Sequence, residues 1–217
     1  MKKLLSVFTA FAMLFCLASC GGETSNDESP STEQPSGTAE VQQQEAASDT
    51  QEQMSDGSEL VVYFSATGNT RSVAEALADM RGAELYEIVP EQPYTSEDLD
   101  YSNDSCRANT EQNDDSARPA ISGSIGNIDQ YDTIFVGFPI WWGTMPRIMY
   151  TFFEAYDMSG KTIAPFCTSG GSGISAAVEE ITGLEPSAAV TEGLQLGSSD
   201  VTEPTGELTE WLGSIGI

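Results

Sequence analysis

Histidine is absent from this 217-residue chain. Without an imidazole, the chain cannot form a Ser-His-Asp triad, a Cys-His nucleophile pair or a histidine-ligated zinc site. Any chemistry must therefore use carboxylates, hydroxyls, thiols, backbone groups or a bound cofactor.

Basic residues are also scarce, with 8 Lys and Arg against 34 Asp and Glu, for a formal net charge of -26 at pH 7. The phosphates of a nucleic acid would be repelled by such a chain, so we expect no nucleic-acid partner. The acidity fits either a well-solvated surface or docking to a basic partner.

The apolar run from Leu4 to Leu17 is shorter than the ~20 residues that a spanning helix needs. It follows Lys2-Lys3 and precedes small residues, which predicts a signal peptide over residues 1–19. Because the two lysines are not a twin arginine, we expect export of the unfolded chain and cofactor uptake outside the cytoplasm.

The tetrad Leu17-Ala18-Ser19-Cys20 resembles a bacterial lipobox, whose cysteine is lipidated. We expect a lipid on Cys20 and an extracytoplasmic, lipid-anchored location on a bacterial membrane; an ordinary secretory signal is the alternative.

Residues 20–58 are rich in Glu, Gln, Ser, Thr, Asp and Pro and contain no basic residue. Such a segment cannot bury enough apolar surface to offset the entropy of ordering, which predicts a disordered acidic tether. The folded domain is then expected over residues 59–217.

Cys106 and Cys167 are the only cysteines left in the folded domain, and their spacing allows either a disulfide or two free buried thiols.

Apolar runs alternate with helical periodicity along this domain, which predicts an α/β fold. We expect a doubly wound five-stranded parallel sheet in the order 2-1-3-4-5, with helices on both faces. A long polar segment, residues 90–127, should wrap the surface with a short helix near residues 97–100 and indicates a functional loop. The expected strands are 60–64, 83–89, 131–138, 161–167 and 190–196, and the expected helices are 70–81, 146–156, 173–184 and 204–212.

In that strand order the first, third and fourth strands are neighbours, and ligands bind beyond their carboxyl ends at the switch point. A loop rich in hydroxyls, an aromatic loop and a glycine-rich loop should meet there. A ligand with one phosphate and a flat ring would contact all three. The loops are Ser65-Ala66-Thr67-Gly68-Asn69-Thr70, Pro139-Ile140-Trp141-Trp142-Gly143 and Thr168-Ser169-Gly170-Gly171-Ser172-Gly173.

The hydroxyl loop lacks the lysine of a Walker motif, so a nucleoside triphosphate fits poorly. Backbone amides and hydroxyls at the positive end of a helix can hold a single phosphate, although a simply capped helix is the alternative. Trp141 and Trp142 are adjacent, so at most one should be buried. The formal G-x-G-x-x-A match at residues 171–176 lies outside the first βα turn, the usual context of a dinucleotide fingerprint.

These segments resemble the flavodoxin family from about residue 60 to the C-terminus. The hydroxyl loop is similar to that family's [ST]-x-T-G-x-T phosphate loop. Residues 107–121, 132–143 and 161–173 resemble a bacterial flavodoxin-like subfamily. The tyrosine-bearing ring loop of well-studied flavodoxins is not evident in this sequence.

The resemblance implies noncovalently bound flavin mononucleotide (FMN) and one-electron transfer. By match, Ser65, Thr67, Gly68, Asn69 and Thr70 would hold the phosphate. Trp141, Trp142 and Gly143 would border the isoalloxazine ring, and residues 168–173 would contact its other edge.

Three functional hypotheses follow. The leading one is a membrane-tethered electron carrier that serves an unidentified redox partner protein, with no catalytic side chain and no metal. The second is an FMN-dependent NAD(P)H:acceptor oxidoreductase of the quinone-reducing type. The third is a binding module that kept the fold and lost the redox role. The lack of an evident dinucleotide fingerprint favours the carrier.

Overall fold

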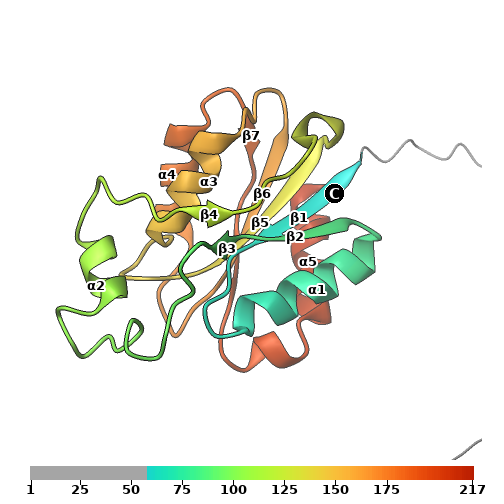
Figure 1. The fold of residues 1–217 in the computed structure, drawn as a ribbon. Helices are drawn as coiled ribbons and strands as arrows, with labels where there is room; N and C mark the ends of the chain where they lie inside the picture. Colours follow the sequence, from blue (N-terminus) through green and yellow to red (C-terminus); the bar gives the residue numbers. More distant parts are fainter. Residues whose placement is uncertain (1–57) are drawn as a thin grey trace, which may run out of the picture. The chain divides into compact units, whose positions relative to one another are not determined.

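A computed structural model describes residues 58–217 of the chain (Figure 1). The predicted signal peptide, the lipid site at Cys20 and all but the last residue of the predicted tether lie outside the described residues. None of the helices within residues 58–217 has both the length and the apolarity needed to cross a bilayer.

The centre of the domain is a parallel sheet in the order β2-β1-β5-β6-β7, with β8 also paired to β6 (Figure 1). Numbered by βα unit, this is the doubly wound order 2-1-3-4-5 that the sequence predicts. The strands are β1 (Glu59–Tyr63), β2 (Glu84–Glu87), β5 (Thr133–Pro139), β6 (Thr162–Thr168), β7 (Ala189–Val190) and β8 (Leu194–Leu196).

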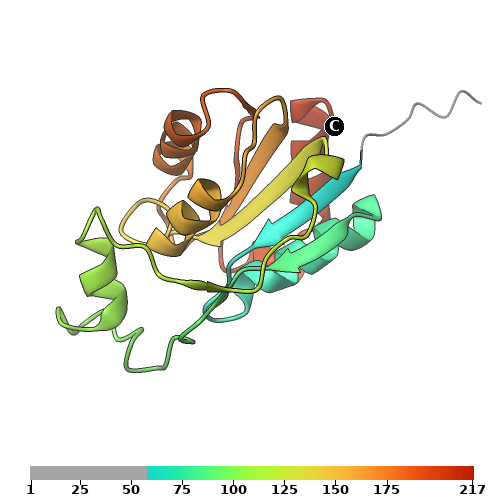
Figure 2. The same ribbon diagram turned by 45° about the horizontal axis from the view of Figure 1, so that its top comes forward.

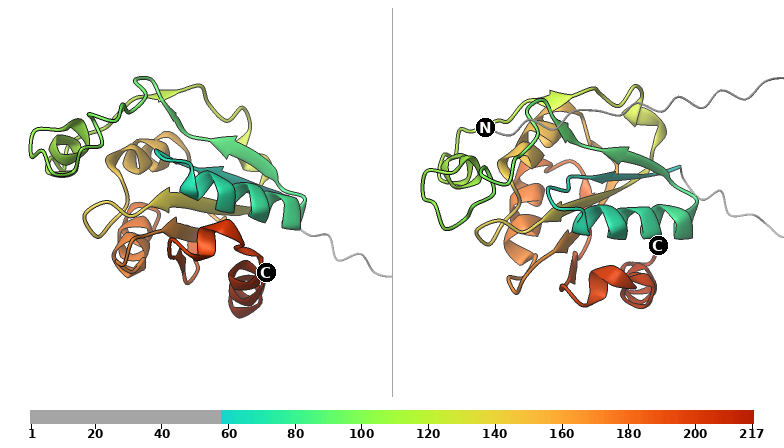
Figure 3. Two further views of the ribbon diagram at one scale, coloured as in Figure 1. Left: turned by 90° about the horizontal axis from the view of Figure 1, so that it is seen from below. Right: turned by 60° about the horizontal axis from the view of Figure 1, so that its bottom comes forward.

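Helices cover both faces of the sheet because its central strands are apolar on both sides. In β1, Leu60 and Val62 pack into one hydrophobic cluster, whereas Val61 and Tyr63 pack into the other. The first cluster lies under α3 (Arg147–Ala155) and α4 (Ser175–Leu184). The second lies under α1 (Asn69–Arg81) and α5 (Thr205–Ile215), which lie side by side (Figure 3).

The predicted strands at 83–89 and 190–196 are each divided in the structure. After β2, the short strand β3 (Val89–Pro90) leaves the main sheet and pairs antiparallel with β4 (Ile121–Ser122). The later run breaks between β7 and β8 at Gly193, where a Cβ atom would lie 2.8 Å from Ile174 Cδ1. The break lets the backbone pass close to α4. Two 3-10 helices, η1 (Ile128–Gln130) and η2 (Asp200–Thr202), complete the described elements.

The predicted helix at residues 97–100 is wrong. That stretch is a hydrogen-bonded turn, in which the Asp98 carboxylate accepts from the backbone N–H and the hydroxyl of Thr95. These side-chain bonds satisfy the backbone locally and compete with a helix. The helix of this segment lies later, at α2 (Arg107–Gln112), where Cys106 Sγ accepts from Asn109 N at the cap.

Cys106 and Cys167 are both free and buried, which decides between the two alternatives that the sequence leaves open. Cys106 lies before α2 and Cys167 lies within β6. Burial raises the pKa of the Cys167 thiol to about 12.

Candidate functional site

Three loops at the carboxyl ends of β1, β5 and β6 enclose a cavity of about 310 Å³. This is the switch point of the doubly wound sheet. The lining residues are Ala66, Thr67, Asn69, Tyr101, Pro139, Ile140, Trp141, Thr168, Ser169, Gly170, Gly197, Ser198 and Val201. The structure therefore brings members of all three predicted loops to one wall.

The hydroxyl loop turns the chain from β1 into α1 at Gly68, whose φ of 94° is in the left-handed region that favours glycine. Its N–H donates to Ser65 Oγ at 3.1 Å. No side chain caps α1, so the amides of its first turn keep their capacity to donate to a ligand. Thr67 and Asn69 are exposed and line the cavity beside these amides.

Thr70 has a different place from the other hydroxyls of this loop. It is buried, and its Oγ1 lies 2.9 Å from Thr168 Oγ1, so one hydroxyl donates to the other across two strand tips. This bond joins the hydroxyl loop to the glycine-rich loop. Thr70 therefore holds the loops together and does not line the cavity itself.

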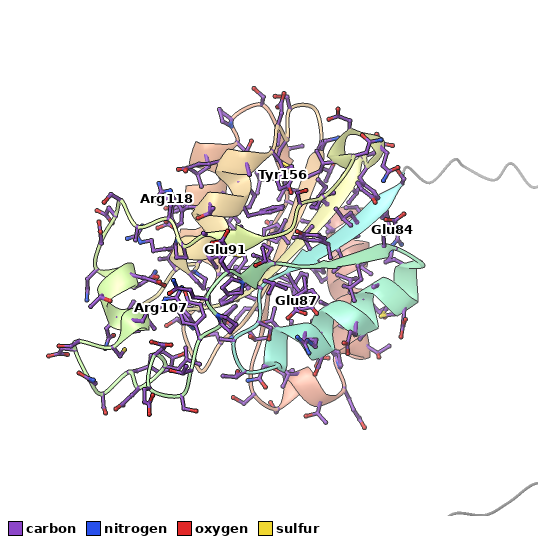
Figure 4. The ribbon with its side chains drawn as sticks, viewed as in Figure 1. Glu84, Glu87, Glu91, Arg107, Arg118 and Tyr156 are labelled. Atoms are coloured by element: carbon purple, nitrogen blue, oxygen red, sulfur yellow. The ribbon has the colours of Figure 1, made fainter. Side chains whose placement is uncertain are left out.

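Arg71 follows the hydroxyl loop but forms an ion pair with Glu87, at the carboxyl end of β2 (Figure 4). The hydrogen bond and the charge of Glu87 raise the pKa of the guanidinium. The side chain is thus committed to a carboxylate, and Arg71 is absent from the cavity lining.

The aromatic loop is a tight turn at the end of β5. Trp141 N donates to Thr144 O at 2.9 Å, and Thr144 N donates back to Trp141 O at 3.1 Å. The two central residues, Trp142 (φ 49°) and Gly143 (φ 87°), are both left-handed. Within residues 58–217, Trp142 is the only non-glycine residue with positive φ, which is costly for a bulky side chain.

The two tryptophans point to different environments, as the sequence predicts. Trp141 is 5% exposed and packs in the core, whereas Trp142 is 48% exposed. The Tyr101 ring lies beside both, with centroid distances of 6.2 Å to Trp141 and 5.4 Å to Trp142. These rings and Ile140 line a second hollow of about 210 Å³, which shares Tyr101, Ile140 and Trp141 with the first.

Tyr101 is a site residue that the sequence does not reveal. It lies in the long segment between β3 and β4, about forty residues before the aromatic loop in the sequence. The unusual length of that segment is the only signal that pointed to it. The structure thus supplies a tyrosine to the aromatic wall from a loop that local motifs do not mark.

The glycine-rich loop contributes its first half to the cavity. Thr168, Ser169 and Gly170 line it, and Ser169 N donates to Leu196 O at 2.9 Å in β8. Gly171, Ser172 and Gly173 are exposed and stand outside the lining, on the way into α4. The formal G-x-G-x-x-A match thus leads into α4 and lies apart from the cavity.

A fifth segment completes the wall, and the sequence-based prediction missed it. Gly197, Ser198 and Val201 lie between β8 and the end of η2. Gly197 N donates to the Asp200 carboxylate at 2.9 Å, which shapes this turn. Across residues 58–217, no group of three or more His, Cys, Asp or Glu side chains is placed to hold a metal ion.

The fold and the position of this cavity define a flavodoxin-like α/β protein. The sequence model of the flavodoxin family matches residues 58–215, which is most of the chain. The chain belongs to the flavodoxin family.

Solved structures agree with this assignment. A candidate flavoprotein from Bacteroides eggerthii is 42% identical, with a TM-score of 0.69, and the match covers 74% of this chain and 98% of that one. One from Bacteroides uniformis is 40% identical, with a TM-score of 0.64 and coverage of 69% and 98%. A flavoprotein from Lactobacillus acidophilus, solved in complex with FMN, is 25% identical, with a TM-score of 0.53 and coverage of 68% and 97%. No match is found among curated proteins.

Proposed function

We propose that this protein is an FMN-binding electron carrier held at a bacterial membrane by a lipid on Cys20. The observation that carries the proposal is the cavity at the switch point, which combines an uncapped helix start with an aromatic wall. The similarity to the Lactobacillus flavoprotein that was solved with FMN supports the choice of cofactor.

The residues present fit FMN. The free amides of the first turn of α1, together with Thr67 and Asn69, would hold the phosphate, and charge-assisted bonds of this kind contribute about 1.5–3 kcal/mol each. Trp142 and Tyr101 would border the isoalloxazine, since their exposed faces can stack on a heteroaromatic ring. When bound, FMN would supply one-electron transfer.

The chain's own residues would tune and protect that group. Trp141, buried behind the aromatic turn, closes the cavity from the core side. Backbone groups of the aromatic turn and the glycine-rich loop lie on the wall and can bond to ring edges. The many surface carboxylates would oppose reduction to an anion and so lower the redox potential.

The electron carrier is favoured over the reductase because the basic side chains of the described residues are already paired within the protein. All six basic side chains in residues 58–217 are engaged within the protein. Arg71, Arg81, Arg107, Arg118 and Arg147 form ion pairs, and Lys161 donates to the carbonyls of Asp129 and Tyr131. A nicotinamide dinucleotide carries two or three phosphates, which such a surface would repel.

The test is to express residues 59–217 with added FMN, record the visible spectrum of the purified protein and titrate it with dithionite. We expect a bound yellow chromophore that bleaches reversibly. NADH or NADPH alone should not reduce it, whereas a partner reductase should. Direct reduction by either nucleotide would support the reductase, and protein that cannot be reconstituted with flavin would support the binding module.

A further inference from the structure

Helix α2 lies in the segment between β3 and β4, apart from the sheet (Figures 1 and 2). It is only six residues long, and yet two polar side chains on it are buried: Asn109 is 4% exposed and Gln112 is 7% exposed. Buried amides are costly unless their hydrogen bonds are used. The partners of these two side chains indicate what the helix does.

Gln112 holds the aromatic turn. Its Nε2 donates to Trp141 O at 3.3 Å and to Met145 O at 3.1 Å, which are backbone carbonyls on either side of the turn. Because both partners are acceptors, the orientation of the amide is determined by chemistry. Its Oε1 is buried without a hydrogen-bond partner, which costs free energy. The two hydrogen bonds from Nε2 to the aromatic turn offset this cost.

Asn109 holds the segment that carries Tyr101. Its Nδ2 donates to Asn103 O at 2.7 Å and to Tyr101 O at 3.3 Å. The helix is itself fastened to the start of α3, because Arg147 Nη2 donates to Gln112 O at 3.1 Å. One short helix is therefore bonded to both backbone segments that carry the exposed rings of the site.

The left-handed Trp142 explains why such a support is needed. A bulky residue with positive φ persists only where the surroundings determine its conformation. Gln112 fixes carbonyls immediately before and shortly after the strained position, at Trp141 and Met145. Loss of these bonds would let the turn relax and the indole move.

We propose that Asn109 and Gln112 are positioning residues that hold the Tyr101 and Trp142 rings in their edge-to-face contact, and thereby shape the aromatic wall for a flat heteroaromatic ring. The identity of that ring as a flavin rests on the proposed function. We call these two side chains and their four hydrogen bonds to the backbone the α2 bracket. The bracket does not depend on the identity of the ligand.

The first test uses the flavin-free, full-length chain in detergent. The sequence contains three tryptophans, of which Trp141 and Trp142 lie in this turn with ring centroids 6.4 Å apart and planes at 86°. Gln112→Met keeps the volume and removes both donors. We expect its near-ultraviolet circular dichroism from tryptophan to fall by about half, with the far-ultraviolet spectrum unchanged, since relaxation of the turn disrupts the coupled pair.

Thr110→Ala is the matched control. Thr110 is exposed on the same helix, and its hydroxyl bonds only to carbonyls of that helix and its cap, so this variant should keep the near-ultraviolet spectrum. If Gln112→Met does not fold, Gln112→Asn, which shortens the reach of the amide by one carbon, replaces it with the same expectation. An unchanged tryptophan spectrum in a folded Gln112 variant would overturn the proposal.

The second test separates the ring from the phosphate. Dissociation constants of riboflavin and of FMN are measured for the parent chain, Gln112→Met and Asn109→Leu. We expect both ligands to bind about tenfold more weakly to each variant, with the ratio of the two constants unchanged, because only the ring end is altered. Thr67→Ala should instead weaken FMN alone.

The outcomes of the two tests are distinguishable. If the parent chain binds neither flavin, the proposed function fails, and the tryptophan spectrum still decides the bracket. If the parent chain binds both and the α2 variants bind them equally well, the bracket fails while the proposed function stands. A weakening of FMN but not of riboflavin in the α2 variants would also overturn the bracket.

Discussion

Thr70 and Thr168 are 98 residues apart in the sequence, and their hydroxyls lie 2.9 Å from each other in the buried wall behind the cavity. At the scale of single residues, the site is held by neutral hydrogen bonds of this kind. The cations near it are turned toward carboxylates, as Arg71 is toward Glu87. Individual substitutions should therefore act through the loss of neutral bonds and of packing.

Thr70→Val should lower the free energy of unfolding by about 1–3 kcal/mol, because it leaves the buried Thr168 hydroxyl without its partner. Urea denaturation of the flavin-free protein measures the change. Thr209→Val is the control, since that exposed hydroxyl bonds only to Thr205 O within α5. Equal stability of the two variants would mean that the bond across the strand tips contributes little.

Cys167 should make stability depend on alkaline pH. Burial raises its pKa from 9.0 to about 12, so the folded state favours the neutral thiol. The resulting stability is fully present below pH 9 and is lost as pH rises from about 9 to about 12. Wild-type protein should lose up to about 1.4 kcal/mol per pH unit more than Cys167→Ala in this window, measured by denaturation. Parallel pH profiles for the two proteins would contradict this.

At the scale of elements, β5 and β6 are in register over seven residue pairs, from Thr133–Thr162 to Pro139–Thr168. This register places Gly137 opposite Phe166, whose ring covers the glycine. A Cβ atom on Gly137 would lie 2.2 Å from Phe166 Cζ. The two strands that position the aromatic and glycine-rich loops can therefore pack this closely only because Gly137 has no side chain.

Gly137→Ala should destabilise the fold by about 1–3 kcal/mol or more, because the added methyl forces the Phe166 ring out of a closely packed position. Thermal unfolding measures the loss. Gly126→Ala is the control, since a Cβ there meets nothing within 4 Å. Phe166→Leu combined with Gly137→Ala should recover part of the loss, and no recovery would place the strain elsewhere.

At the scale of the whole molecule, the proposed lipoprotein signal and the folded domain are separate parts of the sequence. The lipobox-like tetrad ends at Cys20, and the family match begins at residue 58. The acidic composition of the chain, with a formal charge of -26, would suit either a well-solvated surface or the basic redox partner that the proposed function calls for.

Cys20→Ser should release the protein from the membrane, because it removes the proposed site of lipid attachment. Labelled palmitate should enter the wild-type chain and not the variant, and the variant should move to the soluble extracytoplasmic fraction. Ser19→Ala, which keeps Cys20, is the control. Label in the Cys20→Ser chain would contradict the lipidation hypothesis.

Much of the fold could be predicted because the relevant signals are local. Apolar periodicity and turn residues indicated the central strands, the covering helices and hence the strand order. The predicted helix near residues 97–100 does not form, because the side chains of Thr95 and Asp98 close a turn there. Apolar periodicity carries no information on such side-chain hydrogen bonds. The strand expected at residues 190–196 is divided into β7 and β8, because the backbone at Gly193 passes close to α4.

The order of residues along the chain was enough to predict that three loops follow neighbouring strand tips, because the strand order and the residues after each strand are local features. The folded arrangement was needed to show that Tyr101, Gly197, Ser198 and Val201 line the cavity, and that residues 171–173 do not. It also decided that α2 is bonded to both aromatic segments. The physical reason is that these contacts join segments far apart in the chain, where packing and the pairing of buried polar groups outweigh local preference.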